Sequence, residues 1–443
     1  MKHLNYLLLA ALPLVFTACD KDDEPDFVPA LEFATDKLSA DAAGGILSVE
    51  VRADMPYEVV MPQEAEWVKL AEEVPTEAST LTFEVEKNTT ATARTAAVVI
   101  RASEGITSAD TLRIIQSGLD DAADITAEFD PEFAARLQEK GYITDSRHIT
   151  PADVKDITGL DVSGKYGDYE DGKGLTSLKG IEYFTALTHL DCGGNQLTTL
   201  DVSHNTALTQ LGCYWNRLVS LDVSRNIALE KLVFTNNQLT SLDVSQNTAL
   251  EYLDCGQNHL TSLDVSRNVA LTNLGCSSNR LTSLDVSQNT ALTSLVCTYN
   301  QLTTLDVSQN DMLDILSCQY NQLASLDLSQ NAALVELYCD YNRLTALDVS
   351  GNPEIDFLFC SHNQLTFLDL SGNPKLYNLS CTNNRLVSLD VSRNTALRTV
   401  NGFGNPGRDG TFEVTLWPGS ELTVWTESWD YEGQTVTVKY IGR

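Results

Sequence analysis

Cysteines are the most reactive side chains of this sequence, and nine of the ten recur at one fixed spacing. Neighbours lie 21 residues apart, with Phe234 and Gly402 standing where a cysteine is missing. The nine are Cys192, Cys213, Cys255, Cys276, Cys297, Cys318, Cys339, Cys360 and Cys381. In a stack of coils their Cβ atoms would lie near the strand spacing of about 4.8 Å, beyond the roughly 3.8 Å that a disulfide prefers. A file of thiols cannot surround a tetrahedral zinc ion either, so we predict buried free thiols that pack as small hydrophobes, with no metal and no cofactor.

Carboxylates form a second file with the same step. Its members are Asp201, Asp222, Asp243, Asp264, Asp285, Asp306, Asp327, Asp348, Asp369 and Asp390. Unit charges about 4.8 Å apart repel by roughly 3.5 kcal/mol at an effective dielectric constant near 20, so the repulsion needs an offset. One candidate is an Asx turn, in which each carboxylate accepts a hydrogen bond from the serine two residues later. The alternative is bridging by divalent cations, which removal of calcium would test.

Aromatic side chains vary from repeat to repeat around the cysteines, and they are the candidate ligand-binding residues. They are Tyr214, Trp215, Tyr252, Tyr299, Tyr320, Tyr338, Tyr341, Phe357, Phe359 and His362, with Phe403 beyond them. The carboxylates among them are Glu251, Asp254, Glu336, Asp340 and Asp356. Because side chains alternate along a strand, residues that flank each core Leu and Cys should face solvent. We therefore expect an aromatic strip on one sheet face that binds a ligand; the alternative is that exposed Tyr and Phe merely suit strands.

A 21-residue period must position all three sets. Leu190 opens a series of positions 21 apart that ends at Val400, and Asn195 opens another that ends at Asn405. Each unit has two halves that fit the leucine-rich repeat template L-x-x-L-x-L-x-x-N-x-L, with Cys replacing one Leu. A single unit buries too little surface to fold alone, so the coils must stack in register. The predicted fold is a leucine-rich repeat solenoid over residues 187–405 of a multidomain chain.

The file of cysteines, with Leu-Asp-Val-Ser-x-Asn in the other half, resembles the cysteine-ladder internalins. It also resembles many Bacteroidetes surface proteins with leucine-rich repeats. The resemblance covers residues 157–405 approximately and implies adhesion or ligand binding without chemistry.

Segments on both sides of the repeats are expected to cover the open ends of the stack. In residues 119–186, Asp130-Pro131 and a later Gly141 predict a short helix, and Thr150-Pro151 opens a second one. These residues also hold degenerate first repeats around Leu160. Residues 406–443 should form a β cap from segments 411–416, 422–426 and 435–440, with Trp417, Trp425 and Trp429 available for packing.

Residues 28–118 predict an all-β sandwich of short strands. Alternating segments cover residues 46–51, 56–60, 81–85, 96–101 and 111–115. The pattern Gly44-Gly45, Trp67, Asn88, Arg94 and a closing Ile114-Ile115-Gln116-Ser117-Gly118 resembles the BACON domain. That resemblance suggests carbohydrate binding, but no row of aromatics stands ready to stack on sugars. A spacer is the alternative.

The N-terminus predicts secretion and a lipid anchor. Lys2 and His3 precede an apolar run over residues 7–16, too short to span a bilayer. Phe16-Thr17-Ala18-Cys19 resembles a lipobox, which implies removal of residues 1–18 and lipidation of Cys19; an ordinary signal peptide with a chance Cys is the alternative. The acidic tether 19–27 resembles an export signal, which implies the outer membrane and a position facing the cell exterior.

Composition and net charge restrict the classes of ligand that the chain is expected to bind. The 443 residues carry a formal net charge of −32, which disfavours nucleic acids and anionic lipid surfaces. We find no nucleophile paired with a base, no distinctive carboxylate pair and no metal-ligand cluster, so we predict no enzymatic activity. The expected chain is a monomer, attached to a membrane through its lipid alone, that binds a host or bacterial surface protein or a glycan.

Overall fold

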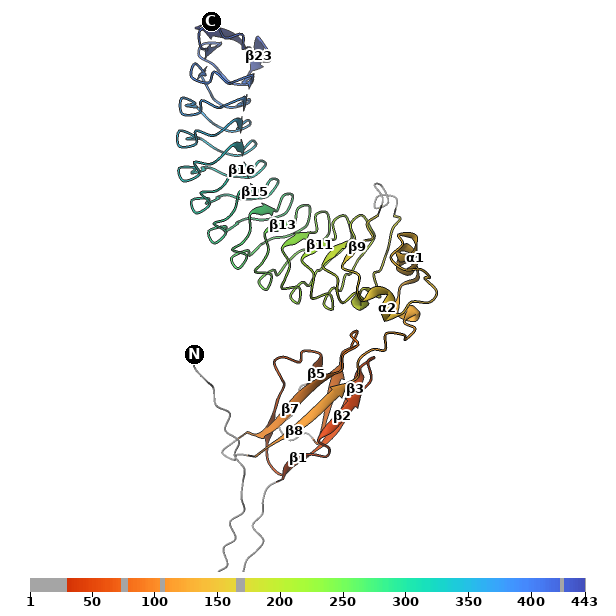
Figure 1. Ribbon diagram of the computed structural model, residues 1–443. Helices are drawn as coiled ribbons and strands as arrows, with labels where there is room; N and C mark the ends of the chain where they lie inside the picture. The colour runs from red at the N-terminus through yellow and green to blue at the C-terminus, as the bar shows by residue number, and fades with distance from the viewer. Residues whose placement is uncertain (1–29, 73–78, 104–107, 165–171, 423–425, 443) are drawn as a thin grey trace, which may run out of the picture. The chain divides into compact units, whose positions relative to one another are not determined.

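The computed structural model describes residues 30–72, 79–103, 108–164, 172–422 and 426–442. Cys19, the signal sequence and the acidic tether lie outside them. The chain forms two compact units, which change over between Gly118 and Leu119, with residues 89–91 counted in the second unit. Each unit is described by itself below (Figure 1).

The first unit consists of two four-stranded sheets whose buried side chains form one hydrophobic cluster. In sheet order, the first holds β1 (Leu31–Phe33), β3 (Gly45–Ala53), β6 (Thr80–Val85) and β5 (Val68–Leu70). The second holds β2 (Lys37–Ala40), β8 (Ala109–Gln116), β7 (Arg94–Ala102) and β4 (Tyr57–Val60). Phe83 of one sheet and Ile100 of the other are fully buried. All five expected segments overlap observed strands, whereas the short strands β1, β2 and β5 were not predicted.

A polar network explains the motif that runs from Trp67 to Gln116. The Arg94 guanidinium lies 4.5 Å from the centre of the Trp67 ring, and its Nε donates to Gln116 Oε1 at 2.8 Å. Gln116 is fully buried and donates through Nε2 to the Glu86 carbonyl at 2.9 Å. Asn88, also buried, donates to two loop carbonyls. These polar residues therefore tie strand ends together inside the unit.

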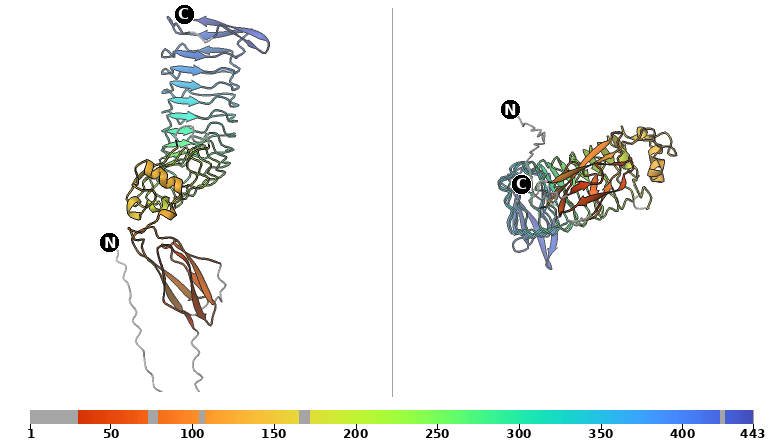
Figure 2. Two further views of the ribbon diagram at one scale, coloured as in Figure 1. Left: turned by 90° about the vertical axis from the view of Figure 1, so that its right-hand side faces the viewer. Right: turned by 90° about the horizontal axis from the view of Figure 1, so that it is seen from below.

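The second unit is a solenoid with a twelve-stranded parallel sheet along one side. In chain order its strands are β9 (Gly159–Asp161), β10 (His189–Asp191), β11 (Gln210–Gly212), β12 (Lys231–Val233), β13 (Tyr252–Asp254), β14 (Asn273–Gly275), β15 (Ser294–Val296), β16 (Ile315–Ser317), β17 (Glu336–Tyr338), β18 (Phe357–Phe359), β19 (Asn378–Ser380) and β21 (Thr399–Asn401). Each central residue pairs with its counterpart in the next coil, as Leu190 does with Leu211, and no register slip occurs. Figure 2 shows these short strands stacked side by side. The predicted leucine-rich repeat solenoid is confirmed.

The first rung of the sheet comes from a degenerate repeat. Leu160 pairs with Leu190, although 30 residues separate them instead of 21. Val162 is fully buried two residues after Leu160, at the position that Cys192 holds in the next coil. Its Leu-Asp-Val-Ser sequence is typical of the other half of a repeat, so the sequence did not indicate that it belongs to the sheet.

The nine repeated cysteines are free thiols with no exposed surface. Burial raises the pKa of each thiol, to about 12 for Cys297 and Cys381. The prediction that these residues act as small hydrophobes is confirmed.

Two ladders of asparagines hold the coils together, one in each half of the repeat. In the cysteine half, Asn216 donates to the carbonyls of Cys192 and Cys213 at 3.0 and 3.1 Å, and its Oδ1 accepts from the Leu197 N–H at 3.0 Å. In the Leu-Asp-Val half, Asn226 donates to the carbonyls of Val202 and Asn205 at 3.0 and 2.9 Å. These bonds satisfy backbone groups in the turns of each coil, which lie outside the ladder of strand hydrogen bonds.

Short elements cover the start of the stack. They are η1 (Thr126–Glu128), α1 (Pro131–Glu139), α2 (Pro151–Val154) and η2 (Ile181–Tyr183). Asp130 caps α1 by accepting from the backbone N–H groups of Glu132 and Phe133, as its position before a proline predicts. Phe133 and Phe184 are fully buried and pack against each other, with 6.2 Å between ring centroids.

A four-stranded sheet covers the other end. Its order is β20 (Ser388–Asp390), β22 (Thr411–Thr415), β24 (Gln434–Ile441) and β23 (Ser428–Tyr431). Trp429 packs on Phe412 and donates through Nε1 to the Asn405 carbonyl at 2.8 Å, and Trp417 packs partly buried against the core. The predicted strands at 411–416 and 435–440 are confirmed. The remaining strand is β23 and not the predicted segment 422–426, of which 423–425, with Trp425, lie outside the described residues.

Candidate ligand-binding surface of the solenoid

The residues beside each central Leu form the outer face of the sheet, because the Leu side chain points into the core. Four of the ten candidate aromatics lie on this face: Tyr252, Tyr338, Phe357 and Phe359. The rings of Tyr338 and Phe359 stack with 5.2 Å between centroids, and the Tyr338 hydroxyl donates to Glu336 at 2.9 Å. We call these four the sheet aromatics.

Five other candidates lie elsewhere, on the turn that follows the cysteine. Trp215, Tyr299, Tyr320, Tyr341 and His362 all have a left-handed backbone, with φ between 51° and 54°. We call them the turn aromatics. The expected single strip on one sheet face is therefore wrong, because the strand ends at the cysteine and the alternation of side chains ends with it. Tyr214 lies between the two groups, directly after Cys213.

Four of the turn aromatics form one continuous stack. The ring centroids of Tyr299, Tyr320, Tyr341 and His362 follow each other at 4.1, 4.2 and 4.0 Å, with interplanar angles of 9–11°. At the far end, Asn383 contacts His362 Nε2 through its amide nitrogen at 3.0 Å, and burial lowers the pKa of His362. Stacked rings are already ordered, so a ligand that binds them loses little additional side-chain entropy.

Carboxylates lie beside the aromatics toward the C-terminal half of the sheet. Asp340 accepts from the Ser361 N–H at 2.8 Å, and burial raises the pKa of its carboxyl. Burial and the nearby Glu336 charge also raise the pKa of Asp356. Asp254 is half-buried on β13, in the middle of the sheet. Glu251 directly precedes Tyr252 in the chain and is exposed.

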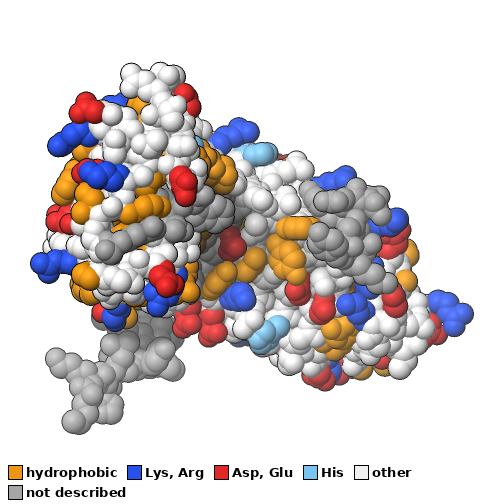
Figure 3. Space-filling model, turned by 90° about the horizontal axis from the view of Figure 1, so that it is seen from above, with side chains coloured by type: hydrophobic (Ala, Val, Ile, Leu, Met, Phe, Trp, Pro, Cys, Tyr) orange, Lys and Arg blue, Asp and Glu red, His pale blue; other side chains and the backbone are white. Residues whose placement is uncertain are grey.

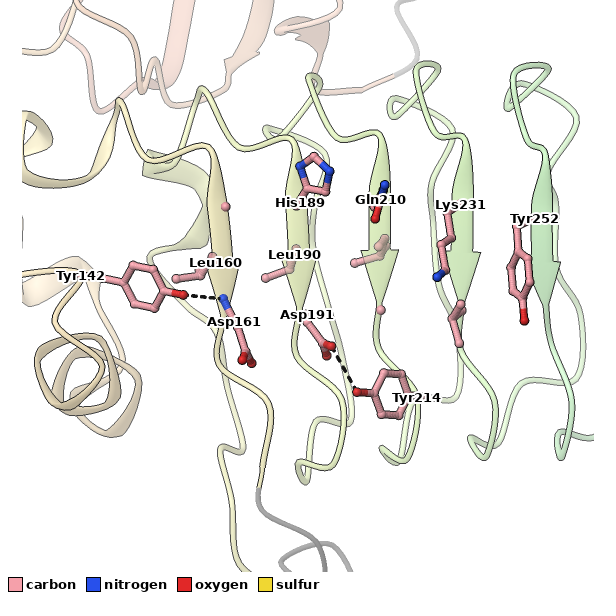
Figure 4. Close-up of a pocket in the computed structure, with 14 residues that line it drawn as sticks. Tyr142, Leu160, Asp161, His189, Leu190, Asp191, Gln210, Tyr214, Lys231 and Tyr252 are labelled. Carbon is pink, nitrogen blue, oxygen red and sulfur yellow. Dashed lines mark hydrogen bonds between the residues drawn. The ribbon is translucent and has the colours of Figure 1, made fainter.

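A hollow of about 610 Å³ opens over the first strands of the sheet, and we call it the first hollow (Figure 4). Its floor consists of central leucines, and its polar lining consists of Tyr142, Asp161, His189, Asp191, Gln210, Tyr214, Lys231 and Tyr252. Tyr142 comes from the N-terminal cap, and its hydroxyl accepts from the Asp161 N–H at 2.9 Å. The Lys231 ammonium lies 5.1 Å from the centre of the Tyr252 ring. Of these residues, sequence reasoning had selected only Tyr214 and Tyr252.

Tyr214 closes one side of the first hollow because glycine lies beneath it. Its hydroxyl donates to Asp191 Oδ2 at 3.1 Å, and a Cβ at Gly193 would lie 2.5 Å from its ring. Burial, followed by the charge of Asp191, raises the pKa of Tyr214 to about 12. The ring is thus held in place as part of the lining of the first hollow.

A second hollow of about 350 Å³ lies over β13, β14 and β15. It is lined by Tyr252 and Asp254, by Gln257, Asn273 and several serines, and by Gly256 and Gly275. Gly212 in the first hollow and Gly275 in the second hold the same position, directly after the central Leu. Glycine at an outward position was the available sequence signal for both hollows.

The aspartate file is capped locally. In every coil the serine N–H two residues later donates to the carboxylate, for example Ser266 to Asp264 at 2.9 Å. Hydrogen bonds from the serine two residues later lower the pKa of eight of these carboxyls. Asp243 is one of them: its pKa is lowered although the charges of Asp222 and Asp264 in the neighbouring coils act to raise it. The predicted Asx turns are confirmed. Among the described residues, no group of three or more His, Cys, Asp or Glu could hold a metal ion.

Charges of both signs are interspersed with uncharged side chains on the face shown in Figure 3. Within the described ranges, no helix is both long and apolar enough to cross a bilayer.

Comparisons with known proteins agree with both units. Residues 57–117 match the BACON family, described as "Putative binding domain, N-terminal". The functional domain of InlJ from Listeria monocytogenes, described as including a cysteine ladder, is 39% identical, with a TM-score of 0.61 over 65% of this chain and 63% of that one. The internalin inlF from Listeria monocytogenes is 21% identical, with a TM-score of 0.54 over 65% of this chain and 93% of that one, and shows the fold alone. No curated protein matches.

The second unit is thus a leucine-rich repeat solenoid with a cysteine ladder, similar to the InlJ domain, and the chain carries a BACON match before it. This chain spans less than two thirds of the InlJ domain that it matches.

Proposed function

We propose that this chain is a non-enzymatic, surface-exposed lipoprotein that binds a protein or glycan ligand through the outer face of its cysteine half, in the manner of an adhesin. The observation that carries the proposal is the preordered stack of turn aromatics beside the sheet aromatics and the two hollows. The two sheets of the first unit, taken as a sandwich, serve as a spacer that carries the solenoid away from the membrane.

The two halves of the repeat support this choice of surface. The outward positions of the Leu-Asp-Val half repeat the same capped aspartate, whereas those of the cysteine half range from Gly to Lys to Tyr. Rigid aromatic side chains supply large contact areas at small entropic cost, which is why they concentrate at binding surfaces.

Alanine substitution tests the surface. Full-length protein is incubated with a glycan array and with host-cell surface extracts, and the triple variant Tyr338→Ala, Phe357→Ala, Phe359→Ala is compared with Phe367→Ala. Phe367 is 72% exposed and lies in the other half of the repeat, so its loss removes an aromatic outside the proposed surface. We expect the triple variant to lose at least tenfold in affinity and Phe367→Ala to bind like the parent.

The alternative is an accessory polysaccharide-binding protein that uses the BACON-like unit, with the solenoid as a scaffold. The family match at residues 57–117 favours it. Glycan binding that survives every solenoid substitution would support this alternative and contradict the first proposal.

The anchor and location rest on residues 16–24 of the sequence. Incorporation of labelled palmitate into the parent, and its loss in Cys19→Ser, is the expected result. Protease treatment of intact cells should then degrade the chain if it faces the exterior. An unlabelled parent would contradict the lipid anchor.

A further inference from the structure

We infer that the second hollow is a subsite for one pyranose ring of a glycan, stacked on the free end of the tyrosine stack at Tyr299. This inference deepens the proposed function and rests on it, since it names the ligand class that one part of the surface takes.

The turn positions of successive coils form a row, and this row contains a gap. Gln257, Ser278 and Tyr299 hold the same position in three consecutive coils, with φ of 51°, 54° and 54°. Tyr299 stacks on Tyr320 on one side, while on the other side the next coil carries only the short Ser278 side chain. Tyr299 is 53% exposed, against 38% for Tyr320, which has rings on both sides. One ring face of Tyr299 is therefore open to a ligand.

The gap has the thickness of one ring. Coils repeat at about 4.8 Å, and the rings of the stack follow each other at 4.1–4.2 Å. A six-membered ring above Ser278 would continue the stack by one step and leave Gln257 on its other face. The second hollow, of about 350 Å³, includes both Gln257 and Ser278 in its lining, and Tyr299 is the next member of the row beyond Ser278, outside the lining itself.

The lining combines the apolar side chains of Leu274 and Val296 with polar groups and one charge. The Asp254 carboxylate accepts from the Gly256 N–H at 3.1 Å through one oxygen. The amides of Gln257 and Asn273 and five hydroxyl side chains complete the polar part; the hydroxyls belong to Thr235, Tyr252, Ser277, Ser278 and Ser294. Neither lysine nor arginine lines the hollow within the described residues, so anionic ligands are disfavoured.

Glycine keeps this carboxylate accessible. A Cβ at position 275 would lie 2.9 Å from Asp254 Oδ1 and 3.1 Å from its Cγ. A side chain at position 275 would therefore displace the Asp254 carboxylate and take up part of the hollow.

A pyranose matches these features together. It presents an apolar face of C–H groups to an aromatic ring, and its hydroxyl edge suits a carboxylate, amides and hydroxyls as partners. A protein's aromatic side chain would leave the polar lining unpaired, which costs binding free energy.

Extension of the stack by substitution tests the subsite. Ser278→Tyr puts a tyrosine into the gap at a backbone position that three neighbouring coils already fill with tyrosine, so the variant is expected to fold. Asn383→Tyr adds the same ring beyond His362 at the opposite end of the row, and it is the matched control.

The probes are methyl glycosides of glucose, galactose, mannose and N-acetylglucosamine, with N-acetyltyrosine amide as the aromatic competitor. Saturation-transfer difference NMR is recorded on the full chain. We expect transfer to the C–H protons of at least one glycoside, an affinity lower by on the order of tenfold or more in Ser278→Tyr, and parent-like binding in Asn383→Tyr.

Three results would overturn the inference: no glycoside binds, Ser278→Tyr binds as the parent does, or the tyrosine amide binds in the gap and the glycosides do not. The proposed function fails separately, when neither arrays nor cell extracts yield a ligand that the sheet-aromatic variant loses. Binding lost in that variant but kept in Ser278→Tyr would leave the proposed function standing without this subsite.

Discussion

The two halves of each coil use the same residue, asparagine, with different hydrogen bonds. In the cysteine half, Asn279 accepts from the Leu260 N–H and donates to the carbonyls of Cys255 and Cys276, all within 3.1 Å. In the Leu-Asp-Val half, Asn268 donates to the carbonyls of Val244 and Asn247, while its buried oxygen has no protein donor among the described residues.

The difference shows where variation is tolerated. In the cysteine half, the inward asparagine and thiol do the structural work, so outward residues such as Lys231 and Ser294 are free to differ. In the other half, the outward aspartate itself caps the turn and therefore repeats. In the cysteine half such caps occur only in some coils, as where Asp254 accepts from the Gly256 N–H, so the outward residue there can change from coil to coil.

High pH should break the cysteine half first, and this is the largest effect we expect. A thiol of ordinary pKa near 9 that burial raises to about 12, as in Cys297, stays protonated in the folded chain while the unfolded chain loses its proton. The stabilisation is complete below pH 9 and is lost as the pH rises toward 12. Each thiol lowers the free energy of unfolding by about 1.4 kcal/mol per pH unit in that window.

Chemical denaturation at pH 8 to 11 measures this slope. The double variant Cys297→Ala, Cys318→Ala should show a shallower slope by about 2.8 kcal/mol per pH unit, whatever its stability at pH 8. Equal slopes in parent and variant would show that the thiols are not the groups that titrate.

Substitution in the two asparagine ladders sharpens the comparison at a smaller scale. Asn279→Ala leaves one N–H and three carbonyls without the amide, of which the Ser277 carbonyl still accepts from the Gln257 N–H. Asn268→Ala leaves two carbonyls without the amide. We expect Asn279→Ala to lower the free energy of unfolding by about 1–3 kcal/mol more than Asn268→Ala, the cost of one further unpaired buried group.

Urea denaturation at pH 7 gives both values. Gln238→Ala, an exposed amide, is the control and should stay within about 0.5 kcal/mol of the parent. Equal losses in the two ladders would mean that the bond from the Leu260 N–H contributes nothing to stability.

Residue spacing predicted the fold almost completely, because the positions that hold it are inward and repeat with few changes, such as Phe234 in place of Cys. Leu190, Cys192 and Asn195 mark one coil, and their partners follow at 21 residues through the solenoid. The sequence also predicted helix α1 of the N-terminal cap, since Asp130 followed by a proline is a typical start of a helix. Leu160 was missed as a strand because its surrounding sequence is that of the opposite half.

The candidate surface was harder to predict, since Trp, Tyr and His give no sign of a left-handed turn. The sign lay in other coils: Gly194 and Gly404 hold the same position, with φ of 66° and 73°. Reading these glycines across the repeat would have separated the turn aromatics from the sheet aromatics. Gly212 and Gly275 would likewise have indicated the two hollows.

The aspartate half should respond least, and only to acid. The Ser266 hydroxyl and N–H lower the pKa of Asp264, so its contribution to stability is present above the ordinary carboxyl pKa and is lost as the pH falls through the lowered value. Asp264→Asn keeps an acceptor oxygen and should melt near the parent at pH 7, with a smaller decrease in Tm below pH 4. An equal decrease in Tm in the parent and in Asp264→Asn would show that the Asp264 carboxylate does not contribute to the acid sensitivity.

Removal of calcium by a chelator then distinguishes the two ways in which the repulsion between the aspartates could be offset, by serine hydrogen bonds or by bridging cations. Each carboxylate is already bound to its own serine N–H, and this contact outweighs the repulsion from neighbouring coils, because the pKa of Asp243 and Asp306 is lowered in spite of it. A cation is therefore not needed to keep the file charged. We expect the Tm at pH 7 to be the same in calcium and in EDTA, by calorimetry of the full chain. A lower Tm in EDTA that Asp264→Asn and Asp285→Asn diminish would show that cations bridge the coils after all.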